Sequence, residues 1–193
     1  MIGRLKLMTR RARAGAFVAG VLVAGAFVAG VLVAGALGIA LALTPAAARA
    51  QHAIDLPLGS TLPDLKVETL DGQPASIGPY IGKTPLLIEV WATWCENCKA
   101  LEPRILAARK KYGQQVKFLG LAVSFNQSPQ RVKLYMEKHG FDVETLYDRK
   151  GEADAVYGVK ATSTVIVVNK AGKIVYAGAG GDQDIEAAIR KAL

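Results

Sequence analysis

Trp94-Cys95-Glu96-Asn97-Cys98-Lys99 is the stretch that best indicates how this chain folds. It directly follows the apolar run Leu86–Trp91, and it opens a segment, from Cys95 to about Tyr112, whose apolar residues recur at helical spacing. A short, nearly continuous apolar run is typical of a strand that is covered on both faces of its sheet. The sequence therefore predicts a buried strand that leads into a helix at two cysteines, which are the only cysteines of the chain.

The spacing of Cys95 and Cys98 predicts thiol–disulfide exchange. A sulfur at the start of a helix lies near unpaired backbone N–H groups and the positive end of the helix dipole, and both favour the thiolate. We therefore expect Cys95 to be the nucleophile, with the lower pKa and the greater exposure. Cys98, one turn further along and buried, is expected to be the resolving thiol that closes the ring and releases the partner.

Three other interpretations of the cysteine pair fit the sequence less well. A structural zinc site needs four ligands, and the only histidines, His52 and His139, do not lie at ligand spacing. Haem attachment through C-x-x-C-H requires a histidine where Lys99 stands. A purely structural disulfide across so short a loop would add little stability. We expect no metal site and no bound cofactor.

Residues 1–50 have the layout of a secretory signal peptide or an N-terminal membrane anchor. A basic start without acids is followed by an uncharged run over residues 14–43, and then by a small-residue cleavage pattern that ends at Ala50. The uncharged run is long enough to span a bilayer, because residues 15–24 are repeated letter for letter at 25–34. Whether it is cleaved or kept, this leader predicts a periplasmic or other extracytoplasmic location, with membrane contact only through the N-terminal segment.

The positive charge of the chain belongs largely to the leader. Residues 1–50 hold six of the 24 Lys and Arg residues and none of the 16 acids, which leaves a net charge of about +2 for residues 51–193. This balance gives no support to nucleic-acid binding. The remaining stretch has the length of one domain and is long enough to bury a core.

Residues 51–193 alternate between strand and helix patterns. Asp71-Gly72 predicts a hairpin between 65–70 and 73–77, and Ser128-Pro129 predicts a helix start that Gly140 ends. The other expected strands are 85–91, 116–123, 143–147, 164–168 and 173–177, and the other expected helices are 95–112, 152–157 and one from Asp182 or Asp184 to the C-terminus. Such alternation predicts an α/β domain with a central mixed sheet flanked by helices.

Residues from about 55 to 193 resemble the TlpA/ResA-like exported thiol–disulfide oxidoreductases of the thioredoxin-fold superfamily. The stretches that carry the resemblance are Glu89–Lys99, with its highly specific W-A-T-W-C-x-x-C string, and Tyr157–Thr164. The hairpin, and the helix at 128–139 with the strand after it, resemble the features that separate this branch from plain thioredoxins. The resemblance implies a thioredoxin-like fold with an N-terminal hairpin and a helix–strand insertion.

The resemblance also implies where a partner polypeptide binds. It would lie beside Trp94 and against the loop formed by Thr162, Ser163 and Thr164. The family has a cis-proline where this chain has Ser163, and a non-proline cis bond costs about 3 kcal/mol. Either the loop holds the serine in a cis conformation, or the edge that binds the partner is reshaped.

Glu89 lies six residues before Cys95, where thioredoxins carry a buried acid. A carboxylate within an apolar strand is costly unless it is neutral or paired, and burial raises its pKa. The predicted role of Glu89 is a general base that takes the proton from Cys98. The alternative is a structural carboxylate that pairs with a lysine such as Lys99 or Lys117.

The direction of exchange is predicted to be reduction of client disulfides. Glu96, next to Cys95, opposes thiolate formation, no histidine separates the cysteines, and a buried base at Glu89 points the same way. The expected partners are disulfide-bearing client proteins, apocytochrome c among the candidates, and a membrane thiol electron donor. The alternatives are a dithiol oxidase or isomerase, a peroxiredoxin-like enzyme, which the missing T-x-x-C pattern disfavours, and a non-catalytic client-binding protein.

Overall fold

The computed structural model describes residues 53–193, and the predicted leader at residues 1–50 lies outside the described residues. Between residues 53 and 193, no helix is both long and apolar enough to cross a membrane.

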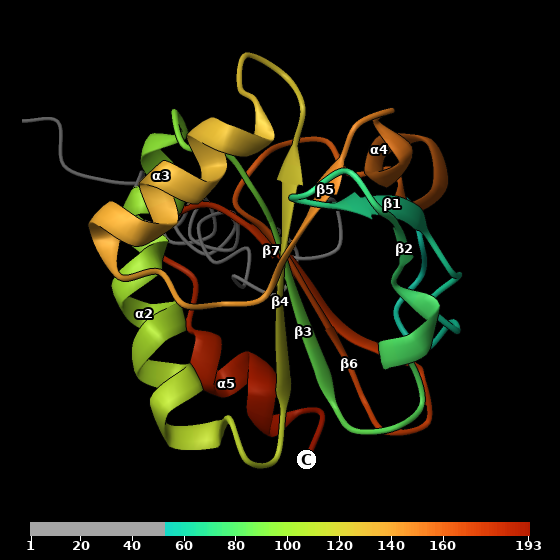
Figure 1. Ribbon diagram of the computed structural model, residues 1–193. Coiled ribbons are helices and arrows are strands. Elements are labelled where there is room, and N and C mark those ends of the chain that lie inside the picture. Colours follow the sequence, from blue (N-terminus) through green and yellow to red (C-terminus); the bar gives the residue numbers. More distant parts are fainter. Residues whose placement is uncertain (1–52) are drawn as a thin grey trace, which may run out of the picture. The chain divides into compact units, whose positions relative to one another are not determined.

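A single seven-stranded mixed sheet forms the centre of the domain (Figure 1), in the order β2-β1-β5-β4-β3-β6-β7. β3 pairs in parallel with β4, and β4 with β5, while the pairs β3–β6, β6–β7, β1–β5 and β1–β2 are antiparallel. In chain order the elements are β1 (Lys66–Thr69), β2 (Pro74–Ser76), the 3-10 turn η1 (Gly78–Tyr80), β3 (Leu86–Trp91), α2 (Glu96–Tyr112), β4 (Lys117–Val123), α3 (Pro129–His139), β5 (Thr145–Asp148), α4 (Glu152–Tyr157), β6 (Thr164–Val168), β7 (Ile174–Ala179) and α5 (Ile185–Arg190).

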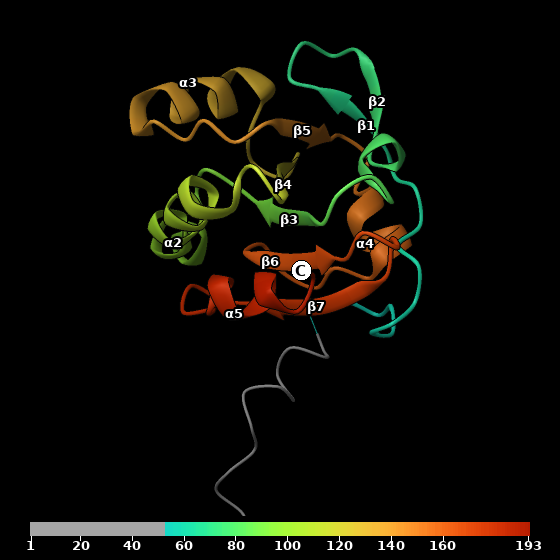
Figure 2. The same ribbon diagram turned by 90° about the horizontal axis from the view of Figure 1, so that it is seen from below.

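Helices cover both faces of the sheet and enclose two hydrophobic clusters. α2, α3 and α5 lie on one face and α4 on the other, as both ribbon views show (Figures 1 and 2). Every residue of β3 is buried, and its side chains alternate between the clusters. Leu87 and Trp91 pack towards α2, whereas Leu86, Ile88 and Val90 pack on the opposite face. Glu89 therefore shares the α2 face with Leu87 and Trp91.

The local signals in the sequence placed most elements correctly. The hairpin turns at Gly72, which has a φ of 79°, and the Ser128 side chain caps α3 by accepting a hydrogen bond from the Arg131 N–H. α3 ends at Gly140 in a left-handed conformation. The predicted strand at 143–147 is wrong at its start, since β5 begins at Thr145; the Thr145 hydroxyl donates to the Val143 carbonyl within the preceding loop.

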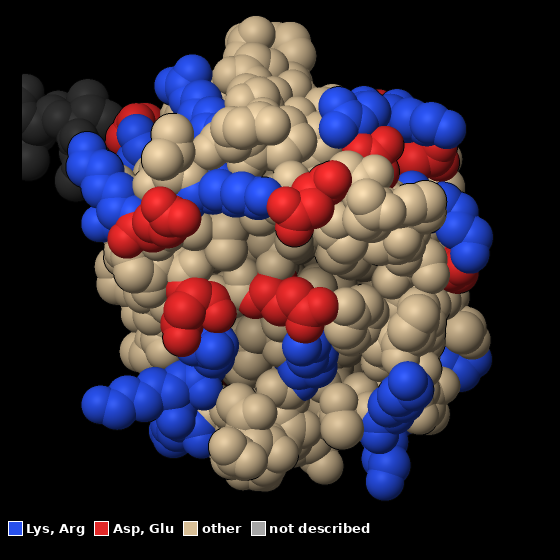
Figure 3. All heavy atoms as spheres, in the orientation of Figure 1, with Lys and Arg blue, Asp and Glu red and all other residues tan. Residues whose placement is uncertain are grey.

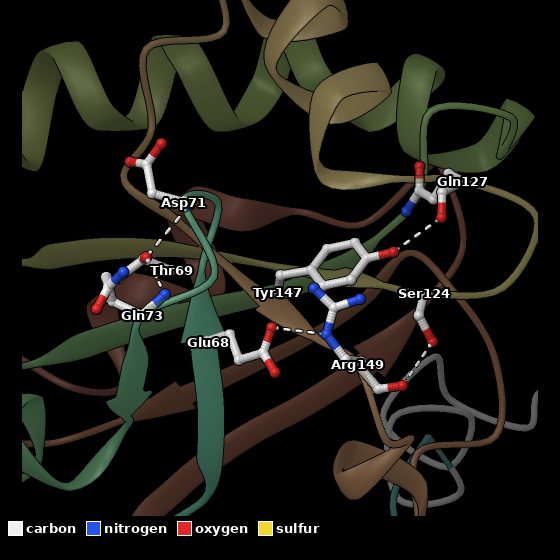
Figure 4. A network of polar contacts seen from close by, with 8 residues as sticks. All are labelled: Glu68, Thr69, Asp71, Gln73, Ser124, Gln127, Tyr147 and Arg149. Carbon is white, nitrogen blue, oxygen red and sulfur yellow. Dashed lines mark hydrogen bonds and ion pairs between the residues drawn. The ribbon is translucent and has the colours of Figure 1, made fainter.

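Polar contacts join the N-terminal hairpin, β5 and the β4–α3 loop, which we define as residues 124–128 (Figure 4). The Arg149 side chain pairs with Glu68 of β1 at 2.7 Å, and the Arg149 carbonyl accepts a hydrogen bond from the Ser124 hydroxyl at 3.1 Å. The Tyr147 hydroxyl donates to the Gln127 carbonyl at 2.8 Å. These contacts hold the β4–α3 loop in place, and Phe125 and Gln127 of this loop form hydrogen bonds with the two residues before Cys95.

Candidate active site

Cys95 and Cys98 form a disulfide at the N-terminus of α2. Cys95 is the N-cap residue, and its Sγ accepts a hydrogen bond from the Cys98 N–H at 3.1 Å. This geometry places the Cys95 sulfur against the unpaired N–H groups of the helix, where a thiolate is stabilised once the disulfide is reduced. The predicted contrast in exposure is wrong for this disulfide form, because Cys95 is 6% exposed and Cys98 is 4% exposed.

Because the two cysteines are about equally buried, alkylation of the reduced protein should distinguish them by the pKa of each thiol. We expect iodoacetamide near neutral pH to modify Cys95 first, since the thiolate is the reactive form and the helix terminus favours it there. Peptide mass mapping after a short reaction identifies the labelled cysteine. Prior labelling of Cys98 would reverse the assigned roles.

Glu96 is an exposed neighbour of the pair and not an isolated charge. Its carboxylate pairs with the Lys99 ammonium at 2.6 Å, so a positive group offsets the negative charge that was expected to disfavour the Cys95 thiolate. Exposure to water weakens both effects. Glu96 therefore contributes less to the predicted direction of exchange than its position in the sequence suggested.

Glu89 is buried in the middle of the sheet, opposite Gly120 of β4 and Val165 of β6. Burial, with a further contribution from the nearby Glu102 carboxylate, raises the pKa of Glu89 to about 8. Among residues 53–193 no ion pair includes Glu89. The predicted alternative of a lysine partner is wrong, because Lys99 pairs with Glu96 and Lys117 pairs with Glu144.

Glu102 and Tyr135 are site residues that the sequence analysis missed. The Tyr135 hydroxyl donates to Glu102 Oε2 at 2.8 Å, and its ring packs against Trp91, with 5.6 Å between ring centroids. Burial and the Glu102 carboxylate raise the pKa of Tyr135, and Glu89 adds to the same effect. Glu102 could have been found from its position four residues after Cys98, on the same helix face. Tyr135 lies 33 residues from Glu102 and leaves no such local signal.

Ser163 takes neither a cis bond nor the position of an exposed edge. No peptide bond in the described part of the chain is cis, and Ser163 has a left-handed backbone, with a φ of 62°. Its hydroxyl accepts a hydrogen bond from the Gly180 N–H at 3.1 Å, and its carbonyl accepts one from Gln183 Nε2 at 2.9 Å. The buried Gln183 side chain also donates to the Gly180 carbonyl, at 2.7 Å. Of the two possibilities left open, the reshaped loop is the one observed.

The reshaped loop leaves little surface for a partner. Ser163 and Thr164 are fully buried, and the Thr164 hydroxyl donates to the Ala161 carbonyl at 2.7 Å. Thr162 is only partly buried, and Trp94 is 37% exposed. A partner that approaches the cysteines would therefore meet Trp94 and Thr162 before the other two residues of the predicted binding set.

A side chain that the sequence analysis missed links the cysteine loop to the β4–α3 loop. Gln127 Oε1 accepts a hydrogen bond from the Thr93 N–H at 2.9 Å, and Gln127 Nε2 donates to the Val123 carbonyl at 2.5 Å. Trp94 Nε1 donates to the Phe125 carbonyl at 2.8 Å. Thr93 and Trp94, the two residues before Cys95, are thus hydrogen-bonded to the loop that follows β4.

Comparison with known proteins agrees with this geometry. The sequence profile of the family described as Redoxin matches residues 57–193. The chain belongs to the redoxin family. This redoxin is 29% identical over 119 residues to the thioredoxin-like protein YneN of Bacillus subtilis, a match that covers 60% of the chain and 68% of the relative. It is 28% identical over 120 residues to the thiol-disulfide oxidoreductase ResA of Geobacillus thermodenitrificans, covering 61% of the chain and 66% of that protein, just under two thirds of its length.

Solved structures show the same fold as this redoxin. A thiol:disulfide interchange protein from a Bacteroides species superposes with a TM-score of 0.61 at 21% identity, covering 70% of this chain and 90% of the other. A thioredoxin-family thiol:disulfide interchange protein from Chlorobium tepidum gives a TM-score of 0.59 at 23% identity, covering 71% and 98%. The expected thioredoxin-like fold and the resemblance to ResA-like proteins are confirmed.

Proposed function

We propose that this redoxin is a thiol–disulfide oxidoreductase that reduces disulfides of client polypeptides. The observation that carries the proposal is the Cys95–Cys98 pair at the start of α2, with the Cys95 sulfur aimed at the helix N–H groups. The similarity to proteins named thiol-disulfide oxidoreductase supports the same activity. Reduction, rather than oxidation, is the direction that the buried Glu89 supports, because a base on the α2 face of β3 would take the proton of Cys98 as the client is released in its reduced form.

In the first step, the Cys95 thiolate attacks one sulfur of the client disulfide. A Cys95–client S–S bond forms, the client S–S bond breaks, and the released client sulfur leaves as a thiolate that takes a proton from water. The helix N-terminus lowers the cost of forming the Cys95 thiolate.

In the second step, the Cys98 thiol loses its proton to the Glu89 carboxylate and attacks Cys95 Sγ. The Cys95–Cys98 disulfide forms, and the second client sulfur leaves as a thiolate and is then protonated. Two electrons have passed from the redoxin dithiol to the client, which now carries two thiols. The step needs a base because Cys98 lies beyond the N–H groups that stabilise Cys95, and Glu89 is the buried carboxylate with a pKa raised to about 8.

The cycle requires a dithiol donor that returns the pair to the reduced state, and we assign this role to a membrane thiol electron donor. The proposed location is periplasmic or otherwise extracytoplasmic, with residues 1–50 as signal peptide or anchor. Apocytochrome c, whose C-x-x-C-H cysteines must be reduced for haem attachment, is a candidate client.

Trapping on a Cys98→Ser variant tests the proposed function. We expect this variant, incubated with insulin as a disulfide substrate, to accumulate a stable mixed disulfide on Cys95, because the resolving thiol is absent. Non-reducing electrophoresis and mass spectrometry measure the adduct, while the wild-type reduced protein should cleave insulin in a single turnover. Failure of the wild-type protein to reduce insulin, together with absence of the adduct, would contradict the proposal.

A further inference from the structure

We propose that Phe125, held against Trp94, is a specificity-determining residue that docks an apolar side chain of the client next to the cysteine under attack. This inference rests on the proposed function and extends it to the class of polypeptide that the redoxin prefers: segments with an aromatic or aliphatic residue within about two positions of the reactive cysteine.

Phe125 is the most exposed large apolar side chain of the described residues. It is 67% exposed, and its ring meets that of Trp94 edge-on with 5.9 Å between centroids. Trp94 has one polar hydrogen, and its bond to the Phe125 carbonyl at 2.8 Å uses it. What Trp94 and Phe125 present to solvent is therefore apolar ring surface without an unpaired donor. Two apolar rings that are exposed side by side next to a reactive group form a surface on which a partner can pack.

The loop that carries Phe125 is fixed at both ends. On one side the Ser124 hydroxyl donates to the Arg149 carbonyl, and on the other the Gln127 carbonyl accepts from the Tyr147 hydroxyl (Figure 4). The Gln127 side chain bridges the Thr93 N–H and the Val123 carbonyl. A ring that is already positioned loses little conformational freedom when a partner packs on it, which favours binding.

The reaction itself brings a polypeptide to this place. A client cysteine bonded to Cys95 carries neighbours whose Cα atoms lie about 4–7 Å from its own, and Trp94 precedes Cys95 directly. The client residues beside its cysteine must therefore pass close to Trp94 and to the Phe125 ring that contacts it.

The chemistry of the surface selects an apolar occupant. Residues 124–128 carry no charge, and the surface at the top of Figure 3, where Figure 1 places the β4–α3 loop, is tan. The charges of Glu96 and Lys99 are paired with each other. On the 162–164 loop, Ser163 and Thr164 are buried, so Trp94 and Phe125 supply the larger accessible surface next to the cysteines.

The test compares two disulfide-bearing peptides that differ only in the residues flanking the cysteine, which are leucine in one and serine in the other. The measured quantity is the ratio of kcat/KM for the leucine peptide to that for the serine peptide. Reduction of each peptide is followed by the change in its fluorescence. Phe125→Ser should lower this ratio about tenfold, which corresponds to about 1.4 kcal/mol. Leu134→Ser is the matched control, because Leu134 is 66% exposed on α3 and should leave the ratio unchanged.

Two outcomes would overturn the inference: an unchanged ratio in Phe125→Ser, and an equal fall of the ratio in Leu134→Ser. An unchanged ratio that comes with an equal loss of kcat/KM for both peptides would indicate that Phe125 only supports the fold of the loop. A change in oligomeric state of Phe125→Ser on size-exclusion chromatography would assign the patch to self-association instead. If the wild-type protein reduces neither peptide nor a small neutral disulfide such as bis(2-hydroxyethyl) disulfide, the proposed function fails, which is distinguishable from a failure of docking.

Discussion

Cys95→Ser is expected to reduce disulfide-reductase activity to the uncatalysed background. A serine hydroxyl does not ionise near neutral pH and cannot form the mixed disulfide, so both steps of the cycle are lost. The loss should be as complete with a small disulfide as with insulin, because the substitution removes the nucleophile and not a docking contact. Reduction of insulin and of bis(2-hydroxyethyl) disulfide, each followed at equal protein concentration, measures the effect.

The control for this variant is structural. The short loop closed by the Cys95–Cys98 disulfide contributes little to stability, so Cys95→Ser should keep the circular dichroism spectrum of the wild-type protein. Cys98→Ser, by comparison, should retain the first attack and lose only the release. A folded Cys95→Ser protein that still turns over disulfides through Cys98 would reverse the roles of the two cysteines.

Glu89→Gln is expected to slow the release step about a hundredfold while changing the first attack by Cys95 little. Glutamine keeps the shape and hydrogen-bonding capacity of the side chain but cannot accept the Cys98 proton. Loss of a general base typically costs about 10²–10⁴ in rate, and water that substitutes for it keeps the effect at the low end of this range. Rapid mixing of reduced protein with a chromogenic disulfide separates formation of the mixed disulfide from its release.

The raised pKa of Glu89 predicts how the release rate changes with pH. Only the carboxylate form of Glu89 accepts a proton, and with a pKa of about 8 roughly a tenth of it is ionised at pH 7. The release rate of the wild-type protein should therefore rise with pH, reach half of its maximum near pH 8 and level off about one pH unit higher. In Glu89→Gln this titration should be absent. Glu137→Gln, which changes an exposed glutamate of α3, should keep the wild-type profile. An identical profile in Glu89→Gln would leave Glu89 a purely structural residue.

The same substitution should stabilise the disulfide form. The pKa of Glu89 rises from 4.5 to about 8 on folding, so between these values the folded protein binds more protons than the unfolded chain, and the free energy of unfolding falls as the pH rises. Glu89→Gln removes this penalty. At pH 7 its free energy of unfolding should exceed that of the wild-type protein by on the order of 3 kcal/mol. Urea titrations at pH 4 and pH 7 measure the difference, which should nearly vanish at the lower pH.

The sequence predicted the features that depend on neighbouring residues. Asp71-Gly72, Ser128-Pro129 and Gly140 act within a few residues through turn and cap geometry, and the hairpin and α3 lie where they indicated. The cysteine motif and the apolar run before it likewise predicted the junction of β3 and α2. Asp184, one of two candidates for the last cap, accepts the hydrogen bond from the Ala187 N–H that begins α5.

What the sequence could not predict depends on contacts between distant segments. The hydrogen bond between Tyr135 and Glu102 joins residues 33 positions apart, and the one between Gln183 and Ser163 joins residues 20 positions apart. No periodic pattern in the sequence predicts either contact. The position of Ser163 was recognised as unusual, but its left-handed backbone follows from bonds to Gly180 and Gln183 that only the fold brings together. Phe125 drew no attention because an exposed aromatic in a loop has no sequence signature of its own.

β3 links the active site of this redoxin to the part of the sheet that is most resistant to unfolding. The strand is hydrogen-bonded on both edges, to β4 and β6, and all of its residues are buried, so its backbone can open only when much of the sheet opens. Cys95 follows the end of this strand by four residues, and Glu89 lies within it. Making and breaking the Cys95–Cys98 bond thus takes place at the edge of the region that we expect to unfold last. We therefore expect repeated redox cycles to leave the framework that aligns the two sulfurs undisturbed.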